Sequence, residues 1–163
     1  MVDLNTFVAW SPLFVFLAYV IAGAVLGRKY LWDKPSEKKL TQYKDTHDTL
    51  LVLSGLILAA LSIVVALSPN DLSNVQDMMT YLSIALVSSL FGAYLVQNFE
   101  TRNLFFYLGE VTEYITILSL GLAFYFYGVT RGQTTMEIVF GIFVAGFVGI
   151  TASNLGFYVE SWK

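Results

Sequence analysis

The sequence predicts an all-α integral membrane protein, in which five transmembrane helices form one bundle. Three observations predict this fold: the chain is strongly apolar, its charges are few, and those charges fall between long apolar runs. Of its 163 residues, 56% are hydrophobic and 13% are charged, whereas a soluble domain carries about 25% charged residues. A soluble chain this apolar would have too few polar side chains to cover its surface. The pattern is typical of a polytopic membrane protein.

Five apolar stretches approach or exceed the roughly 20 residues that cross a ~30 Å hydrocarbon layer. The segments between them are short, apart from a basic loop over residues 28–48 that we expect on the cytoplasmic side. Neighbouring spans are therefore expected to form antiparallel hairpins. We recognise no second domain and no internal repeat, so residues 1–163 are expected to form a single transmembrane domain. The predicted spans cover residues 7–27, 49–67, 78–97, 104–128 and 136–159.

The positive charges predict the orientation of the bundle. Cytoplasmic segments of membrane proteins are enriched in Lys and Arg, and an alternating path of five spans places eight of the nine Lys and Arg residues on one side. We therefore predict that the N-terminus lies outside and the C-terminus in the cytoplasm, in the cytoplasmic membrane of a prokaryotic cell. The eight residues are Arg28, Lys29, Lys34, Lys38, Lys39, Lys44, Arg102 and Lys163, and Arg131 falls on the other side.

The three tryptophans support these span limits. Trp10 lies near the outer end of the first predicted span, Trp32 just past its inner end, and Trp162 after the fifth span. Amphipathic aromatic rings prefer the headgroup level of a bilayer, so positions at the span ends are the expected ones.

The basic loop contains two local signals. The run Lys-Pro-Ser-Glu at residues 34–37 is typical of a helix start, with Pro near the first turn, and a short interfacial helix through Tyr43 is expected there. The lysines of this helix either contact anionic lipid headgroups or act only as the topology signal. His47, between two aspartates, is interpreted as part of the start of the second span, with acidic residues in its first turn.

Small residues predict where helices pack. Lipid does not drive helices together, so close backbone approach must supply the contact energy. The fifth predicted span carries small residues four positions apart, which form a groove for another helix of this chain or of another subunit. Shorter sets of small residues occur in the first and third spans. The fifth-span face consists of Gly141, Ala145, Gly149 and Ser153, and the shorter sets are Ala18 with Ala22, Gly23 with Gly27, and Ala85 with Ser89 and Ala93.

Two glutamates inside the fourth predicted span are the main candidates for chemistry. At 1.5 Å per residue, Glu110 lies ~9 Å and Glu113 ~14 Å from the cytoplasmic end of that span, within the hydrocarbon layer. They are three residues apart and share one helix face, where two ionised carboxylates would repel each other. An ionisable residue inside a membrane is a candidate functional residue by default. No Lys or Arg is predicted at that depth, and Asn154 in the fifth span is a candidate hydrogen-bond partner. Further candidates are Thr151, Thr112, Tyr107 and Tyr114.

Three states of the glutamates stay open. The carboxyl groups are protonated and hydrogen-bonded, or they face a water-filled cavity and bind a cation or proton, or they pair with a basic residue of a partner subunit. The first state is structural, whereas the second implies transport and the third implies a complex.

Missing motifs narrow the function classes. The chain has no Cys and a single His, which argues against thiolate metal sites, bis-histidine haem and Ser-His catalysis within it. It also has no phosphate-binding glycine loop and no metalloprotease motif. The basic residues are concentrated in one loop, so there is no broad basic surface for nucleic acid. We therefore expect no catalytic residues, no metal and no cofactor.

Two functions follow from these features. The first is a non-catalytic small integral membrane subunit of a larger multi-subunit membrane complex, such as a respiratory, oxidase or transport assembly. It would be an accessory subunit if the complex is an enzyme, and its partners would be the lipid bilayer and other membrane subunits. The second is a self-associating proton or cation channel or carrier that uses Glu110 and Glu113. An enzyme or lipid-modifying protein is less well supported, because few polar groups converge at one depth.

Overall fold

The computed structural model describes residues 10–27, 31–34, 37–67, 72–98, 102–130 and 140–149, and none of these residues lies in a strand. The all-α prediction is thus confirmed for this part of the chain. Four long helices cover Ser11–Leu26 (α2), Glu37–Leu67 (α4), Leu72–Gln97 (α5) and Asn103–Thr130 (α6), and a shorter helix covers Phe140–Gly149.

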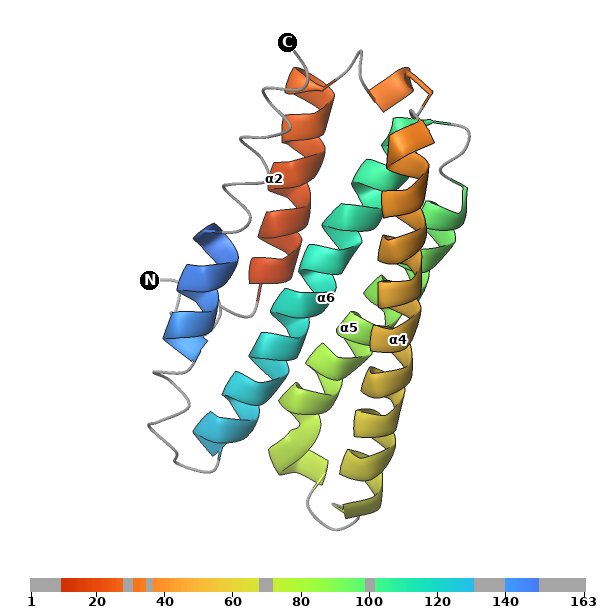
Figure 1. Ribbon diagram of the computed structural model, residues 1–163. Coiled ribbons are helices and arrows are strands. Elements are labelled where there is room, and N and C mark those ends of the chain that lie inside the picture. Colours follow the sequence, from red (N-terminus) through yellow and green to blue (C-terminus); the bar gives the residue numbers. More distant parts are fainter. Residues whose placement is uncertain are drawn as a thin grey trace.

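The helices form a bundle in which successive elements alternate in direction (Figure 1). α5 and α6 are the central antiparallel pair, α4 packs against α5, and α2 packs against α6. The shorter helix lies beside α6, near the end of the bundle where α6 ends. This up-and-down arrangement is the one expected for short connections between spans.

Among the described residues, three helices are long and apolar enough to cross a membrane, over Lys44–Ala66, Val75–Gln97 and Asn103–Gly128. They correspond to the second, third and fourth predicted spans. α2 has 16 residues, which is about 24 Å at 1.5 Å per residue, and Phe140–Gly149 is about 15 Å long. Parts of the predicted spans 7–27 and 136–159 lie outside the described residues. The structure thus supports a membrane protein, while five spans and their orientation stay predictions.

Part of the basic segment 28–48 is helical and not a loop, while its cytoplasmic position stays a prediction. α4 begins at Glu37 and continues without a break to Leu67, so residues 37–48 are the first turns of a long helix. The expected helix start at residues 34–37 is in the right place, but the helix does not stop near Tyr43. No Pro or Gly interrupts the chain between Glu37 and Thr49, so helical hydrogen bonding continues into the apolar span.

Two glycines set the distance between α5 and α6. A Cβ atom at Gly92 of α5 would overlap the hydroxyl of Thr112 on α6, and a Cβ atom at Gly109 of α6 would overlap the side chain of Val96 on α5. Val96 is fully buried, and its branched side chain has little rotamer freedom. The missing Cβ atoms allow the two backbones to approach closely, which is how helices gain contact energy in lipid.

A hydroxyl pair joins α4 to the central pair. The Oγ atoms of Ser54 on α4 and Ser89 on α5 lie 2.8 Å apart, and both side chains are buried. Ala85, Ser89 and Ala93, one of the shorter sets of small residues, are all buried in the bundle. This set is therefore a packing face of α5.

We predict that Gly109→Ala lowers the free energy of unfolding by about 1–3 kcal/mol, the usual cost of overpacking a tight core. The new Cβ atom has no space, because Val96 already occupies it. Unfolding in mixed micelles with increasing denaturing detergent measures the change. Gly55→Ala is the matched control, since no described atom lies within 4 Å of the position that its Cβ atom would take. Equal stability of the two variants would show that α5 and α6 do not depend on this close approach.

Candidate functional site

The structure places both candidate glutamates on α6 in partly buried positions. Glu110 lies near Tyr107, one helical turn before it, and interacts with it electrostatically. Glu113 makes no hydrogen bond or ion pair with the described residues. Asn154, the predicted hydrogen-bond partner, lies outside the described part of the chain, so its pairing with the glutamates stays a prediction.

A cluster of tyrosines lies next to Glu110, where α2 meets α6. The hydroxyl of Tyr107 donates a hydrogen bond of 2.6 Å to the backbone oxygen of Tyr19 on α2. The ring of Tyr19 also lies 5.4 Å from the ring of Tyr114, centroid to centroid. Tyr107 reaches α2 because Gly23 has no side chain: a Cβ atom there would come within 2.7 Å of the Tyr107 ring.

Tyr107 and Tyr114 are among the predicted hydrogen-bond candidates for the glutamates, but their cluster with Tyr19 on α2 is absent from our sequence-based predictions. The signal that could have revealed it is the spacing of Tyr107, Glu110 and Tyr114, which places all three on one face of a helix. The small Gly23, opposite that face, is the complementary signal. Neither identifies α2 as the partner helix, because spacing within one helix does not say which other helix it meets.

Hydroxyl groups also line the side of α6 that packs in the bundle. Thr112 is one of the predicted candidates near the glutamates, whereas Thr116 and Ser119 were not predicted. Thr112 and Thr116 are buried and donate hydrogen bonds to backbone oxygens of their own helix, at 2.6 and 2.8 Å. Ser119 is fully buried, and its Oγ atom has no hydrogen-bond partner among the described residues. Since the two threonines are satisfied locally, these groups do not form a continuous hydrogen-bonded chain across the bundle.

The predicted small-residue face of the last helix points away from the described part of the chain. Gly141, Ala145 and Gly149 are exposed, and no described atom lies within 4 Å of a Cβ built at either glycine. The opposite, aromatic side of this helix contacts α6. There Phe143 packs against Gly121, and the ring of Phe140 lies 4.6 Å from that of Tyr125. Ser153, the last member of the predicted face, lies outside the described residues.

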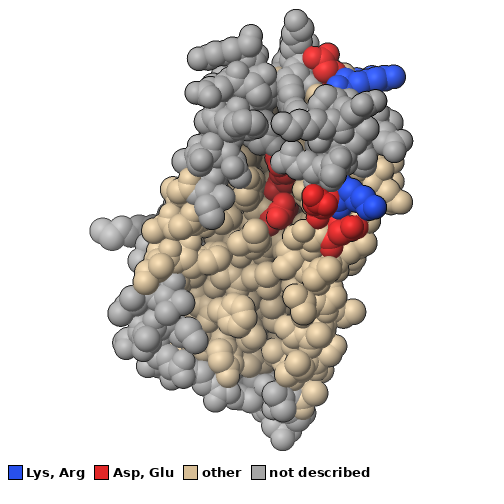
Figure 2. Space-filling view, in the orientation of Figure 1, with Lys and Arg blue, Asp and Glu red and all other residues tan. Residues whose placement is uncertain are grey.

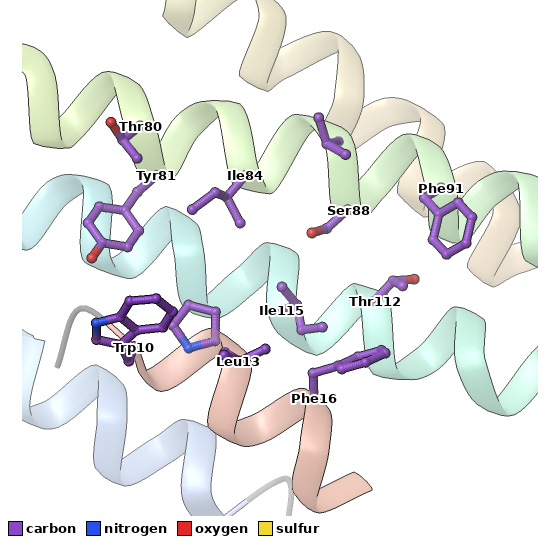
Figure 3. A pocket seen from close by; sticks show the side chains of 12 residues that line it. Trp10, Leu13, Phe16, Thr80, Tyr81, Ile84, Ser88, Phe91, Thr112 and Ile115 are labelled. Atoms are coloured by element: carbon purple, nitrogen blue, oxygen red, sulfur yellow. The ribbon is translucent and has the colours of Figure 1, made fainter. Parts of the chain in front are cut away.

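One groove lies between α2, α5 and α6 and has a volume of about 720 Å³ (Figure 3). Trp10, Leu13 and Phe16 approach it from the α2 side, and Tyr81 and Ile84 line it on α5. Two smaller grooves have volumes of about 440 and 370 Å³. None of the three is lined by an acidic, basic or histidine side chain among the described residues. Such surfaces accept hydrocarbon, and the one ionisable side chain among the described lining residues of each groove is a tyrosine: Tyr81, Tyr125 and Tyr107 in the order of decreasing volume.

Charged side chains gather toward one end of the bundle, near the starts of α4 and α6, on the face that Figure 2 shows. His47 lies inside α4, not at its start, and its Nδ1 atom is 3.1 Å from Oδ1 of Asp48. No helix starts at His47, because α4 begins at Glu37, but His47 does lie in the first turn of the candidate span Lys44–Ala66. No group of three His, Cys, Asp or Glu side chains in the described part of the chain is placed to hold a metal ion.

The chain matches no protein-family model, and no curated protein or solved structure is significantly similar to it. Its function must therefore be argued from the residues themselves. The arrangement provides two partly buried carboxyl groups on one helix, an exposed face of small residues on another, and apolar grooves between helices.

We predict that Tyr107→Phe lowers the free energy of unfolding by about 0.6–1.7 kcal/mol, the range measured for hydrogen bonds between membrane helices. The variant loses the hydrogen bond to Tyr19 but keeps the ring that packs against α2. Unfolding in mixed micelles again provides the measurement. Tyr94→Phe, at an exposed position of α5, is the matched control and should leave stability unchanged. A Tyr107→Phe variant as stable as its control would exclude this bond as a determinant of α2 docking.

Proposed function

We propose that this protein is a non-catalytic integral membrane subunit of a larger membrane complex. The observation that carries the proposal is the exposed small-residue face of the helix Phe140–Gly149. In lipid, a leucine-rich surface gains little by meeting another helix, but a face of small residues gains close backbone contact. The described helices of this chain leave that face open, so a helix of another subunit is the natural partner.

The chemistry of the chain supports a non-catalytic role. The three grooves have no carboxylate, basic or histidine side chain among their described lining residues. Glu113 is partly buried and has no cation beside it in the described part of the chain. A carboxylate inside a membrane commonly pairs with another group, and a basic side chain of a neighbouring subunit would fill that role. An assembly of the respiratory, oxidase or transport type would contain such subunits.

We predict that Ala145→Leu reduces the amount of co-purifying subunits at least severalfold. The larger side chain would fill the small-residue groove and keep the partner helix from approaching. The measurement is quantitative mass spectrometry of the tagged full-length chain, gently extracted from its native membrane. Ala59→Leu, at an exposed position of α4, is the matched control and should retain the partners. Recovery of the unsubstituted chain alone, or only with copies of itself, would contradict the proposed subunit role.

A second candidate function is a self-associating proton or cation channel or carrier. It is favoured by Glu110 and Glu113, which are partly buried on one face of α6. The described grooves favour the subunit role instead, because neither carboxylate lines any of the three. A pore would therefore have to form between copies of the chain, with the glutamate faces directed toward one another.

If the protein conducts, Glu113→Gln should reduce proton or cation flux by at least tenfold, since the amide cannot carry a negative charge or exchange a proton at neutral pH. Flux into proteoliposomes that contain only this chain is the measurement. Asp77→Asn, an exposed acidic position near the start of α5, is the control and should conduct normally. Flux that persists unchanged in Glu113→Gln would remove Glu113 from the transport path, and absence of flux in the unsubstituted chain would remove the channel function.

A further inference from the structure

We propose that the groove between the end of α2 and the start of α6 binds an anionic phospholipid, with an acyl chain in the groove and the phosphate at Arg102. This site is independent of the proposed subunit role. It also differs from the larger groove of Figure 3, which lies along the other half of α2.

The groove has a volume of about 370 Å³ and an apolar wall. Its α2 side is formed by Val20, Gly23 and Ala24, and its α6 side includes Leu104 and Leu108. Ala24 is exposed, so the groove is open along its α2 side. In a membrane, the molecules that meet an open apolar groove at this position are the hydrocarbon chains of lipids.

The rim of the groove carries a positioned cation. Trp32 lines the groove and is 57% exposed. The guanidinium carbon of Arg102 lies 4.4 Å from the centre of the Trp32 ring, which is a cation–π contact. The backbone N–H of Asn103 donates a 3.1 Å hydrogen bond to the oxygen of Asp33, and this bond holds the Trp32 segment against the start of α6. This contact uses none of the guanidinium N–H donors, and those donors suit a phosphate.

The charge around the rim selects an anionic headgroup. Lys34 and Arg102 are both exposed there, and Asp33 is the one acidic residue among 31–34 and 102–104. Basic residues, a tryptophan and an apolar groove follow one another here. They match the headgroup, the glycerol region and the acyl chain of a lipid, in that order.

Fluorescence quenching of Trp32 tests the proposal directly. The full-length chain with Trp10→Phe and Trp162→Phe retains Trp32 as its single tryptophan. It is reconstituted in phosphatidylcholine vesicles with a fixed fraction of phosphatidylglycerol, and either one lipid or the other has brominated acyl chains. The ratio of the two quenching efficiencies gives the relative binding of phosphatidylglycerol and phosphatidylcholine at Trp32. We expect at least a fivefold preference for phosphatidylglycerol.

Three variants locate the headgroup and the chain. Arg102→Gln should reduce the preference about fivefold, which is the effect of one cationic side chain near a membrane surface. Lys44→Gln removes an exposed positive charge that does not line the groove, and it should keep the preference. Ala24→Leu narrows the groove and should weaken quenching by both brominated lipids.

The same measurements can overturn the proposal. Equal quenching by the two lipids in the parent chain excludes a selective site, and this outcome does not depend on whether any of the three variants folds. Equal losses in Arg102→Gln and Lys44→Gln would indicate general surface charge instead of a site. Unchanged quenching in Ala24→Leu would place the acyl chain outside the groove. Displacement of the lipid by millimolar inorganic phosphate would indicate a site for a free anion.

Discussion

The close approach of α5 and α6 is the constraint on which the rest of the structure depends. It exists because Gly92 and Gly109 leave no Cβ atom between the two backbones, and because Thr112 and Val96 fill the space that those atoms would take. In water, such a contact would be one of many that bury apolar surface. In lipid the surroundings are as apolar as the helix surface, so fitted contacts of this kind supply much of the energy of association.

The other helices are added to this central pair by a few specific contacts. Ser54 on α4 meets Ser89 on α5 through a buried pair of hydroxyl groups, and Tyr107 on α6 meets the backbone of α2 beside Gly23. In each contact a hydroxyl group meets an oxygen of the opposing helix, and Gly23 gives the Tyr107 ring the space to do so. A polar group in hydrocarbon must find a partner, so these contacts fix which faces meet as well as how strongly.

The candidate functional features lie on helix surfaces that are not fully covered by the packing of the described helices. The aromatic side of the helix Phe140–Gly149 packs against α6, and its small-residue side is exposed among the described residues. α2 packs against α6 beside Tyr107. A groove lies between the end of α2 and the start of α6, where Arg102 contacts the Trp32 ring. Glu110 lies beside the tyrosine cluster, whereas Glu113 lies on the same helix without a described partner. The exposed helix face thus consists of small residues, and the groove is mainly apolar, with Arg102 at its rim.

The sequence by itself determined that the chain is helical and suited to a membrane, because bilayer thickness requires long apolar runs and the composition supplies them. It also located the start of α4 near Pro35, from local turn chemistry. It did not show that this helix continues unbroken into the span, because interfacial and transmembrane helices share the same local preferences.

Only the tertiary structure decided which small-residue face packs within the chain. The sets Ala85, Ser89, Ala93 and Gly141, Ala145, Gly149 have the same four-residue spacing, yet the first is buried and the second is exposed. The α5 set and the neighbouring Gly92 pack beside Gly109 and Thr112 of α6 and Ser54 of α4, whereas the last helix meets α6 through its phenylalanines. A spacing pattern describes one surface only, and packing depends on whether the opposing surface fits it.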